Sequence, residues 1–160
     1  AAALGLPYAF ASHFAPAALD EAIEIYRRDF RPSAQLRQPY VMAGYNVFAA
    51  DSAEQAQLIA TSMQQSFVRL RTGQPGKLQP PVPGYYEDLP AQAQAMLADV
   101  LSVSSIGTQA DVERDLAAFL RRTQVDEVII TGQIYDVAAR KHSFAIAMAA
   151  AQALGARELA

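Results

Sequence analysis

Residues 40–50 read YVMAGYNVFAA, an apolar run interrupted only at Gly44 and Asn46. A run of this length and composition is typical of a strand buried on both faces, as in the middle of a parallel sheet. The following residues, 51–71, place apolar side chains three and four apart, which is the spacing of a helix with one buried face. This stretch therefore predicts a buried strand followed directly by a helix.

Capping signals predict where the helices begin and end. Asp51 and Glu54 predict a capping box for the helix that ends before Gly73. Thr108 and Asp111 predict a second capping box, at the start of a helix that runs towards the next strand. Apolar periodicity predicts further helices over residues 16–30, 90–100 and 143–154, the last of them capped by Gly155.

Two more apolar runs predict strands, at residues 8–11 and at 127–131 (EVIIT). Strands that alternate with helices indicate an α/β fold with a parallel sheet and right-handed crossovers. Three parallel strands alone leave two open sheet edges. Residues 1–4, followed by Gly5, resemble the last turn of a helix, so we expect a preceding portion of the fold that this sequence does not contain.

The segment GQPGKLQPPVPG, residues 73–84, contains four prolines and three glycines and predicts no regular element. We interpret residues 73–89 as an irregular surface insertion within one partial domain that spans residues 1–160.

Composition excludes several classes of function. The net charge of −3 and the pI of about 5.3 provide no basic surface for nucleic acid. Without cysteine there are no disulfides, and the two histidines lack the spacing of a metal site. No apolar run is long enough to cross a membrane and no signal peptide is evident, so we expect a cytoplasmic protein.

In parallel α/β folds, ligands bind at the carboxyl ends of the strands. Ser12, His13 and Phe14 follow the first predicted strand. His13 is either a general acid or base, because the pKa of histidine lies near neutrality, or a hydrogen-bond donor, or only a cap without chemistry.

The other two strand ends carry further candidates. Asn46 is a polar residue within the buried run, where it either contacts a ligand or makes a structural hydrogen bond in the sheet; Tyr45 must face the opposite side. Gln133, Tyr135 and Asp136 follow the third predicted strand, and Asp136 either contacts a ligand or caps the last helix.

Three blocks of the chain together resemble the luciferase-like family of flavin-dependent monooxygenases. Residues 3–16, ALGLPYAFASHFAP, are similar to a family block that ends with Ser-His-Phe after the sixth barrel strand. Residues 31–60, RPSAQLRQPYVMAGYNVFAADSAEQAQLIA, resemble the seventh strand and its helix. Residues 107–148, GTQADVERDLAAFLRRTQVDEVIITGQIYDVAARKHSFAIAM, resemble the closing helix, the eighth strand and the final helix.

The resemblance implies that the chain is the C-terminal three βα units, strands six to eight, of a TIM (β/α)8 barrel. It implies a small organic substrate, O2, and reduced FMN at the carboxyl end of the barrel, with the flavin supplied by a reductase and the protein forming a homodimer. A barrel of this kind can also use F420 in place of FMN. Under this hypothesis His13 is catalytic, Ser12, Asn46 and Gln133 bind the cofactor, and Phe14, Tyr135 and Asp136 bind the substrate.

The resemblance also implies that the missing N-terminal half of the barrel is a partner of this chain. An isolated fragment would then be inactive, although the whole protein is an oxidoreductase. The alternative is a non-catalytic flavin-binding or structural protein of the same fold lineage, because a fold does not fix an activity.

Overall fold

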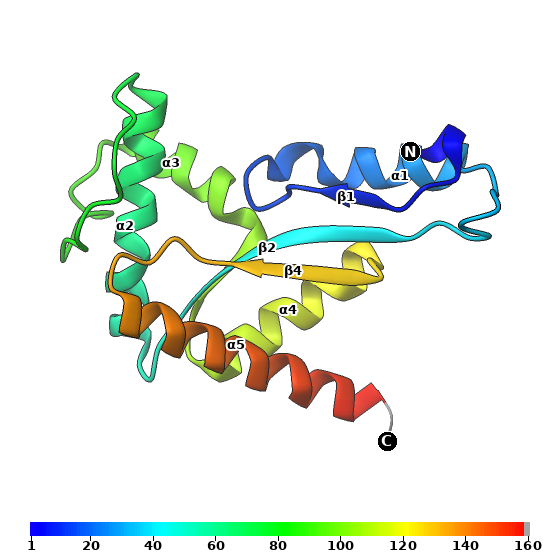
Figure 1. The fold of residues 1–160 in the computed structure, drawn as a ribbon. Coiled ribbons are helices and arrows are strands. Elements are labelled where there is room, and N and C mark those ends of the chain that lie inside the picture. The colour runs from blue at the N-terminus through cyan, green and yellow to red at the C-terminus, as the bar shows by residue number, and fades with distance from the viewer. Residues whose placement is uncertain (159–160) are drawn as a thin grey trace.

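A computed structural model describes residues 1–158, and β2 (Val41–Ala49) forms the centre of its sheet, where the apolar run predicted a strand (Figure 1). β1 (Tyr8–Phe10) and β4 (Glu127–Thr131) pair in parallel with β2. Both of them pair with Met42 and Ala43, so they lie on opposite edges of β2. The prediction of an α/β fold with a parallel sheet is confirmed.

A fourth strand, β3 (Ser104–Gly107), pairs in parallel with Asn46–Ala49 at the carboxyl half of β2. The prediction of three strands was wrong, because the sequence SSIG has too few apolar residues to indicate a strand. Its pairing is fixed by tertiary contacts, among them the 3.0 Å hydrogen bond between the Tyr45 hydroxyl and the Ser105 hydroxyl.

Within residues 1–158, five α-helices accompany the sheet. Figure 1 shows α4 and α5 side by side on one side of the strands, and α2 and α3 near the end where β2 and β4 finish. No helix within residues 1–158 combines the length and the hydropathy that a membrane span requires. The helices are α1 (Leu19–Asp29), α2 (Ala53–Arg71), α3 (Ala91–Val100), α4 (Gln109–Thr123) and α5 (Val137–Glu158).

One of the two predicted capping boxes is confirmed. The carboxylate of Asp111 accepts hydrogen bonds from the backbone N–H and the hydroxyl of Thr108, which closes the box at the start of α4. The cap predicted at Asp51 was wrong by one residue. Ser52 caps α2, and its hydroxyl accepts a 3.2 Å hydrogen bond from the Gln55 N–H.

The last helix begins at Val137 rather than at the predicted Ser143. The Asp136 carboxylate accepts a 2.7 Å hydrogen bond from the Ala139 N–H, which provides a cap six residues earlier. Ser143 is instead fully buried within α5, and its hydroxyl accepts a 2.9 Å hydrogen bond from the Ala49 N–H. This bond ties α5 to the end of β2.

The glycine predictions have mixed outcomes. Gly5 has a φ of +61° and ends a 3₁₀ turn over Ala2–Leu4, as predicted. Gly155 does not end α5, which continues to Glu158. Residues 73–89 contain no helix or strand, in agreement with their proline and glycine content. The predicted domain included residues 159–160, which lie outside the described residues.

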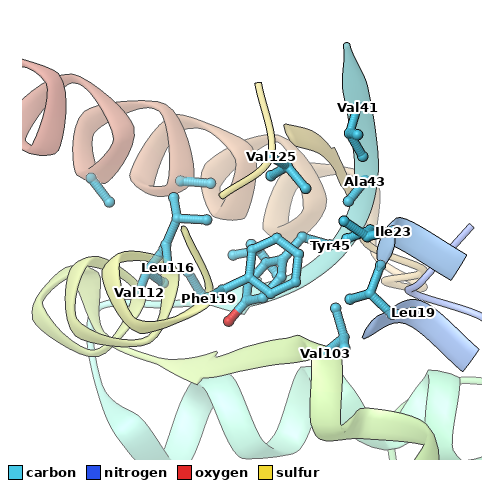
Figure 2. Close-up of a cluster of buried hydrophobic side chains, with 14 of the residues drawn as sticks. Leu19, Ile23, Val41, Ala43, Tyr45, Val103, Val112, Leu116, Phe119 and Val125 are labelled. Carbon is cyan, nitrogen blue, oxygen red and sulfur yellow. The ribbon is translucent and has the colours of Figure 1, made fainter. Parts of the chain in front are cut away.

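The helix-covered face of the sheet contains the main hydrophobic core (Figure 2). Every second residue of β2 contributes to it, as expected for a strand whose side chains alternate between two faces. Tyr45 is central, since its ring lies 4.8 Å from the ring of Phe119 on α4. Burial raises the pKa of the Tyr45 phenol to about 12. The buried β2 residues of this core are Val41, Ala43, Tyr45, Val47 and Ala49.

The opposite face of β2 is covered only at its carboxyl end. There Phe48 packs with Met63 and Phe67 of α2, with Leu97 of α3 and with Ile134 after β4. These residues form a second, smaller core that holds α2 and α3 against the end of the sheet.

Towards the amino end of β2 and along β4, that face is open, whereas Gly44 and Asn46 are buried. Ala9 of β1 is exposed and Met42 of β2 is partly exposed. Ile129 of β4 keeps 49% of its surface accessible, whereas its neighbour Ile130 packs against the main core. We call this surface of Ala9, Ala11, Met42, Ile129 and Thr131 the open sheet face.

Replacing adjacent isoleucines tests the two faces. Ile130→Ala should lower the free energy of unfolding of this chain by about 2 kcal/mol or more, because it removes packed methyl groups from the core. Ile129→Ala, the matched control on the same strand, should change it by only about 0.5 kcal/mol. Urea denaturation of both variants measures the difference, and equal losses would contradict the open face.

The capping box of α4 predicts an acid-sensitive contribution to stability. Hydrogen bonds from the Thr108 N–H, from its hydroxyl and from Arg114 lower the pKa of Asp111 from 3.8 to about 2. Because the pKa in the folded state is the lower one, the stabilisation is complete above the unfolded value and is lost as the pH falls towards 2. Asp111→Asn should therefore be less stable than the parent chain near neutral pH.

That stability difference should shrink as the pH falls towards 2 and should be lost below it, where the parent carboxyl is protonated as well. Urea midpoints measured from neutral to acidic pH check this. A difference that stays constant with pH would show that the charge of Asp111 does not contribute.

Candidate functional site

Ser12 holds the end of β1 to β2. Its side chain is fully buried, and its hydroxyl donates a 2.6 Å hydrogen bond to the carbonyl oxygen of Gly44. The bond joins residues 32 positions apart in the chain. Ser12 thus sets the position of the residue that follows it, His13.

The imidazole of His13 lies directly over Gly44. A Cβ atom on Gly44 would be 2.0 Å from Nδ1 of His13, so only glycine leaves room for the ring. Nδ1 is buried and has no hydrogen-bond partner among the described residues, while the side chain as a whole is partly exposed. Burial lowers the pKa of His13 below its ordinary value of 6.5.

Asn46 fixes the main chain at His13. Its side-chain N–H donates a 2.9 Å hydrogen bond to the His13 carbonyl oxygen. Only 1% of Asn46 is accessible, and its Oδ1 is buried without a partner within the described chain. Asn46 and Tyr45 lie on opposite faces of β2, as the alternation predicted.

The segment after β4 places its three candidates differently. Gln133 is exposed, and Tyr135 keeps 49% of its surface accessible. Asp136 caps α5, the structural role that the sequence left open for it. The segment approaches β2 closely at Gly132, which has no Cβ atom. A Cβ there would lie only 2.6 Å from the Val47 carbonyl oxygen.

Phe14 is the most exposed of the candidates near β1. It keeps 57% of its surface accessible, and its ring lies 6.1 Å from that of Phe67 on α2. A half-exposed aromatic ring beside His13 provides an apolar surface for a ligand at this edge.

The structure therefore brings some predicted residues together and leaves others apart. Ser12, His13 and Asn46 form one hydrogen-bonded unit around Gly44. Gln133, Tyr135 and Asp136 follow the carboxyl end of β4, which pairs with β2. No described hydrogen bond links them to His13.

Two residues of the site were missed from the sequence. Gly44 accommodates the His13 ring, and a glycine within a buried strand often marks such a close approach, so the signal was present. Thr131 pairs opposite Asn46 on β4 and belongs to the open sheet face, but nothing in the run EVIIT distinguishes it.

A separate hollow of about 700 Å³ lies between α1 and α4. Three of its charged side chains already have partners within the hollow: Arg122 binds Asp20, and Arg27 donates to the Thr123 carbonyl oxygen. It lies on the helix side of the sheet, away from the strand ends, and we do not assign a site to it.

Comparison with known proteins identifies the relatives of this chain. It is 47% identical over 148 residues to a luciferase-like monooxygenase of Escherichia coli (strain K12), an alignment that covers 92% of the chain. The chain belongs to the luciferase-like family. It is also 41% identical over 143 residues to the uncharacterized protein YvbT of Bacillus subtilis (strain 168).

The family resemblance has a structural counterpart. The crystal structure of apo-MsnO8 matches with a TM-score of 0.74 over 94% of this chain and 46% of that one, at 22% sequence identity. At this identity the match supports the fold alone. The chain spans 44% of the length of the E. coli relative and 43% of YvbT. No protein-family model matches the sequence.

The buried hydroxyl of Ser12 gives a test of the site. Ser12→Ala should lower the free energy of unfolding by about 1 to 2 kcal/mol, because a buried hydrogen bond to β2 is lost. Ser102→Ala is the control, since that exposed hydroxyl bonds only to Asp99 in its own turn and should matter by less than about 0.5 kcal/mol. Chemical denaturation compares the two, and similar losses would argue against the tie between β1 and β2.

Proposed function

We propose that β1, β2 and β4, each with the helix that follows it, are three βα units of a (β/α)8 barrel in an FMN-dependent monooxygenase, and that this chain supplies one side of its flavin site. The observation that carries the proposal is the open sheet face, which ends at the carboxyl edge in the His13 unit. In a barrel, this face would point inwards and pack against the remaining strands.

The distribution of apolar residues supports the barrel. Helices cover one face of the sheet, and the other face exposes Ile129 and the small residues Ala9 and Ala11. A parallel sheet is stable when both faces are covered. Because the relatives are more than twice as long as the matched region, the additional chain length is sufficient for the other strands.

The residues at the carboxyl edge fit the ring system of a flavin. His13 and Gln133 are partly or fully exposed and can hydrogen-bond to the carbonyl and N–H groups of a flavin ring. Phe14 and Tyr135 provide exposed aromatic surface for the substrate side. Ser12 and Asn46, which are buried, hold His13 in place.

The phosphate of FMN requires other residues. None of the candidate side chains at this edge is cationic, so we assign them to the ring system and the phosphate to a part of the barrel beyond this chain. When bound, a reduced flavin would be the group that reacts with O2. The residues of this chain would orient the ring and keep water from it.

A chimaera tests the proposal, with this chain replacing the matching 148 residues of the E. coli relative. The chimaera should bind FMN in a fluorescence titration, whereas the 160-residue chain alone should bind it much more weakly. His13→Ala in the chimaera should weaken FMN binding by up to about tenfold, the value of one hydrogen bond.

Two outcomes would contradict the proposal. A folded chimaera that binds F420 and not FMN would exclude the cofactor, and one that binds neither would exclude the flavin site. The barrel fold has its own control. In the chimaera, Ile129→Ala should lower the free energy of unfolding as much as Ile130→Ala does, because the remaining strands then cover the open sheet face.

A further inference from the structure

We infer that Gly44 holds His13 as a neutral imidazole with its proton on Nε2, so that His13 acts as a hydrogen-bond donor. The sequence alone left the choice between an acid or base, a donor and a cap open. The functional part of this inference, the donation to a flavin, rests on the proposed function.

The first step is the position of the ring. Nδ1 occupies the space that a side chain on Gly44 would fill, 2.0 Å from the ideal Cβ position. The hydrogen that replaces Cβ on Gly44 therefore points towards Nδ1. An unprotonated nitrogen accepts such a contact as a weak C–H hydrogen bond, whereas a proton on Nδ1 would oppose it.

The second step is the absence of a partner. Nδ1 is buried, and no acceptor for an N–H at this atom exists among the described residues. A buried N–H donor without an acceptor costs free energy. Two states of the ring carry a proton on Nδ1, the neutral Nδ1–H tautomer and the imidazolium, and both are disfavoured. The neutral Nε2–H tautomer remains.

The third step is the rigidity of the arrangement. The Ser12 hydroxyl bonds to the Gly44 carbonyl at 2.6 Å, and the Asn46 amide bonds to the His13 carbonyl at 2.9 Å. Both bonds connect the backbone beside the ring to β2. These bonds therefore keep the main chain at His13 in place over β2, and the position of Nδ1 itself comes from the contact with Gly44.

The charge environment agrees with this geometry. Burial alone lowers the pKa of His13, and no charged side chain of the described residues contributes to the shift. Nε2 is not among the buried, unpartnered atoms, so it is the nitrogen that a ligand at the carboxyl edge can reach. A neutral donor fits a carbonyl oxygen or an anionic atom of the ligand.

Nuclear magnetic resonance of the ¹⁵N-labelled 160-residue chain tests the tautomer directly. Long-range ¹H–¹⁵N spectra distinguish the two neutral tautomers and the imidazolium. The chain has two histidines, and His142→Asn assigns the signals of His13. We expect the Nε2–H tautomer near neutral pH and at pH values below the ordinary histidine pKa of about 6.5.

Gly44→Ala tests the cause. The added Cβ should displace the ring, so that His13 shows both tautomers and a pKa closer to its ordinary value. Gly76→Ala is the control, because a Cβ there meets only the Arg69 guanidinium group, at 3.3 Å. If Gly44→Ala does not fold, the parent spectrum still decides: an Nδ1–H tautomer, or an imidazolium near neutral pH, would overturn the inference.

The role as a donor has a separate test in the FMN-binding chimaera. His13→Gln places an amide N–H near the position of Nε2 and should keep the FMN affinity within about threefold, against a loss of up to about tenfold for His13→Ala. A glutamine variant as weak as the alanine variant would exclude donation. If the chimaera does not bind FMN while the parent chain shows the Nε2–H tautomer, the proposed function fails and the tautomer stands.

Discussion

The pairing of β2 with all three other strands is the constraint on which the rest of the structure depends. β1 and β4 bind opposite edges of its amino-terminal half, and β3 binds its carboxyl-terminal half. Every strand pairing described in the sheet therefore involves β2, a strand of nine residues. Because side chains alternate along it, β2 also separates the molecule into a helix-covered face and a face that is covered only at its end.

This separation explains why the candidate site is where it is. On the helix side, Tyr45 and its neighbours are buried by α1, α4 and α5. On the other side, Gly44 and Asn46 have no helix above them, and the segment after β1 fills the space with His13. The same strand thus provides the hydrophobic core with one set of residues and the candidate site with the other.

The proposed flavin site and the physical chemistry of this edge agree on a modest role for the protein side chains. Ser12, Asn46 and Gly44 do not present reactive groups, and their contacts all serve to fix one imidazole. A site of this kind positions and hydrogen-bonds its ligand, which suits chemistry performed by a cofactor. The exposed aromatic rings of Phe14 and Tyr135 extend the same edge.

Several predictions failed at places where a local signal was weak or duplicated. Asp51 and Ser52 are both good caps, and the cap hydrogen bond of α2 is made by Ser52. Asp136 competes with Ser143 as the start of α5, and the burial of Ser143 against Ala49 decides between them. β3 has almost no apolar signal, so its pairing with β2 depends on contacts that a single sequence does not reveal.

The sequence by itself determined the α/β class, the central strand, the capping box at Thr108 and Asp111, and the clustering of polar candidates at the strand ends. These features follow from short-range patterns of apolar spacing, capping and chain order. Only the tertiary structure decided that His13 lies on Gly44 and that one sheet face stays open. Both depend on residues more than 30 positions apart meeting across strands, and such meetings leave no periodic pattern in the chain.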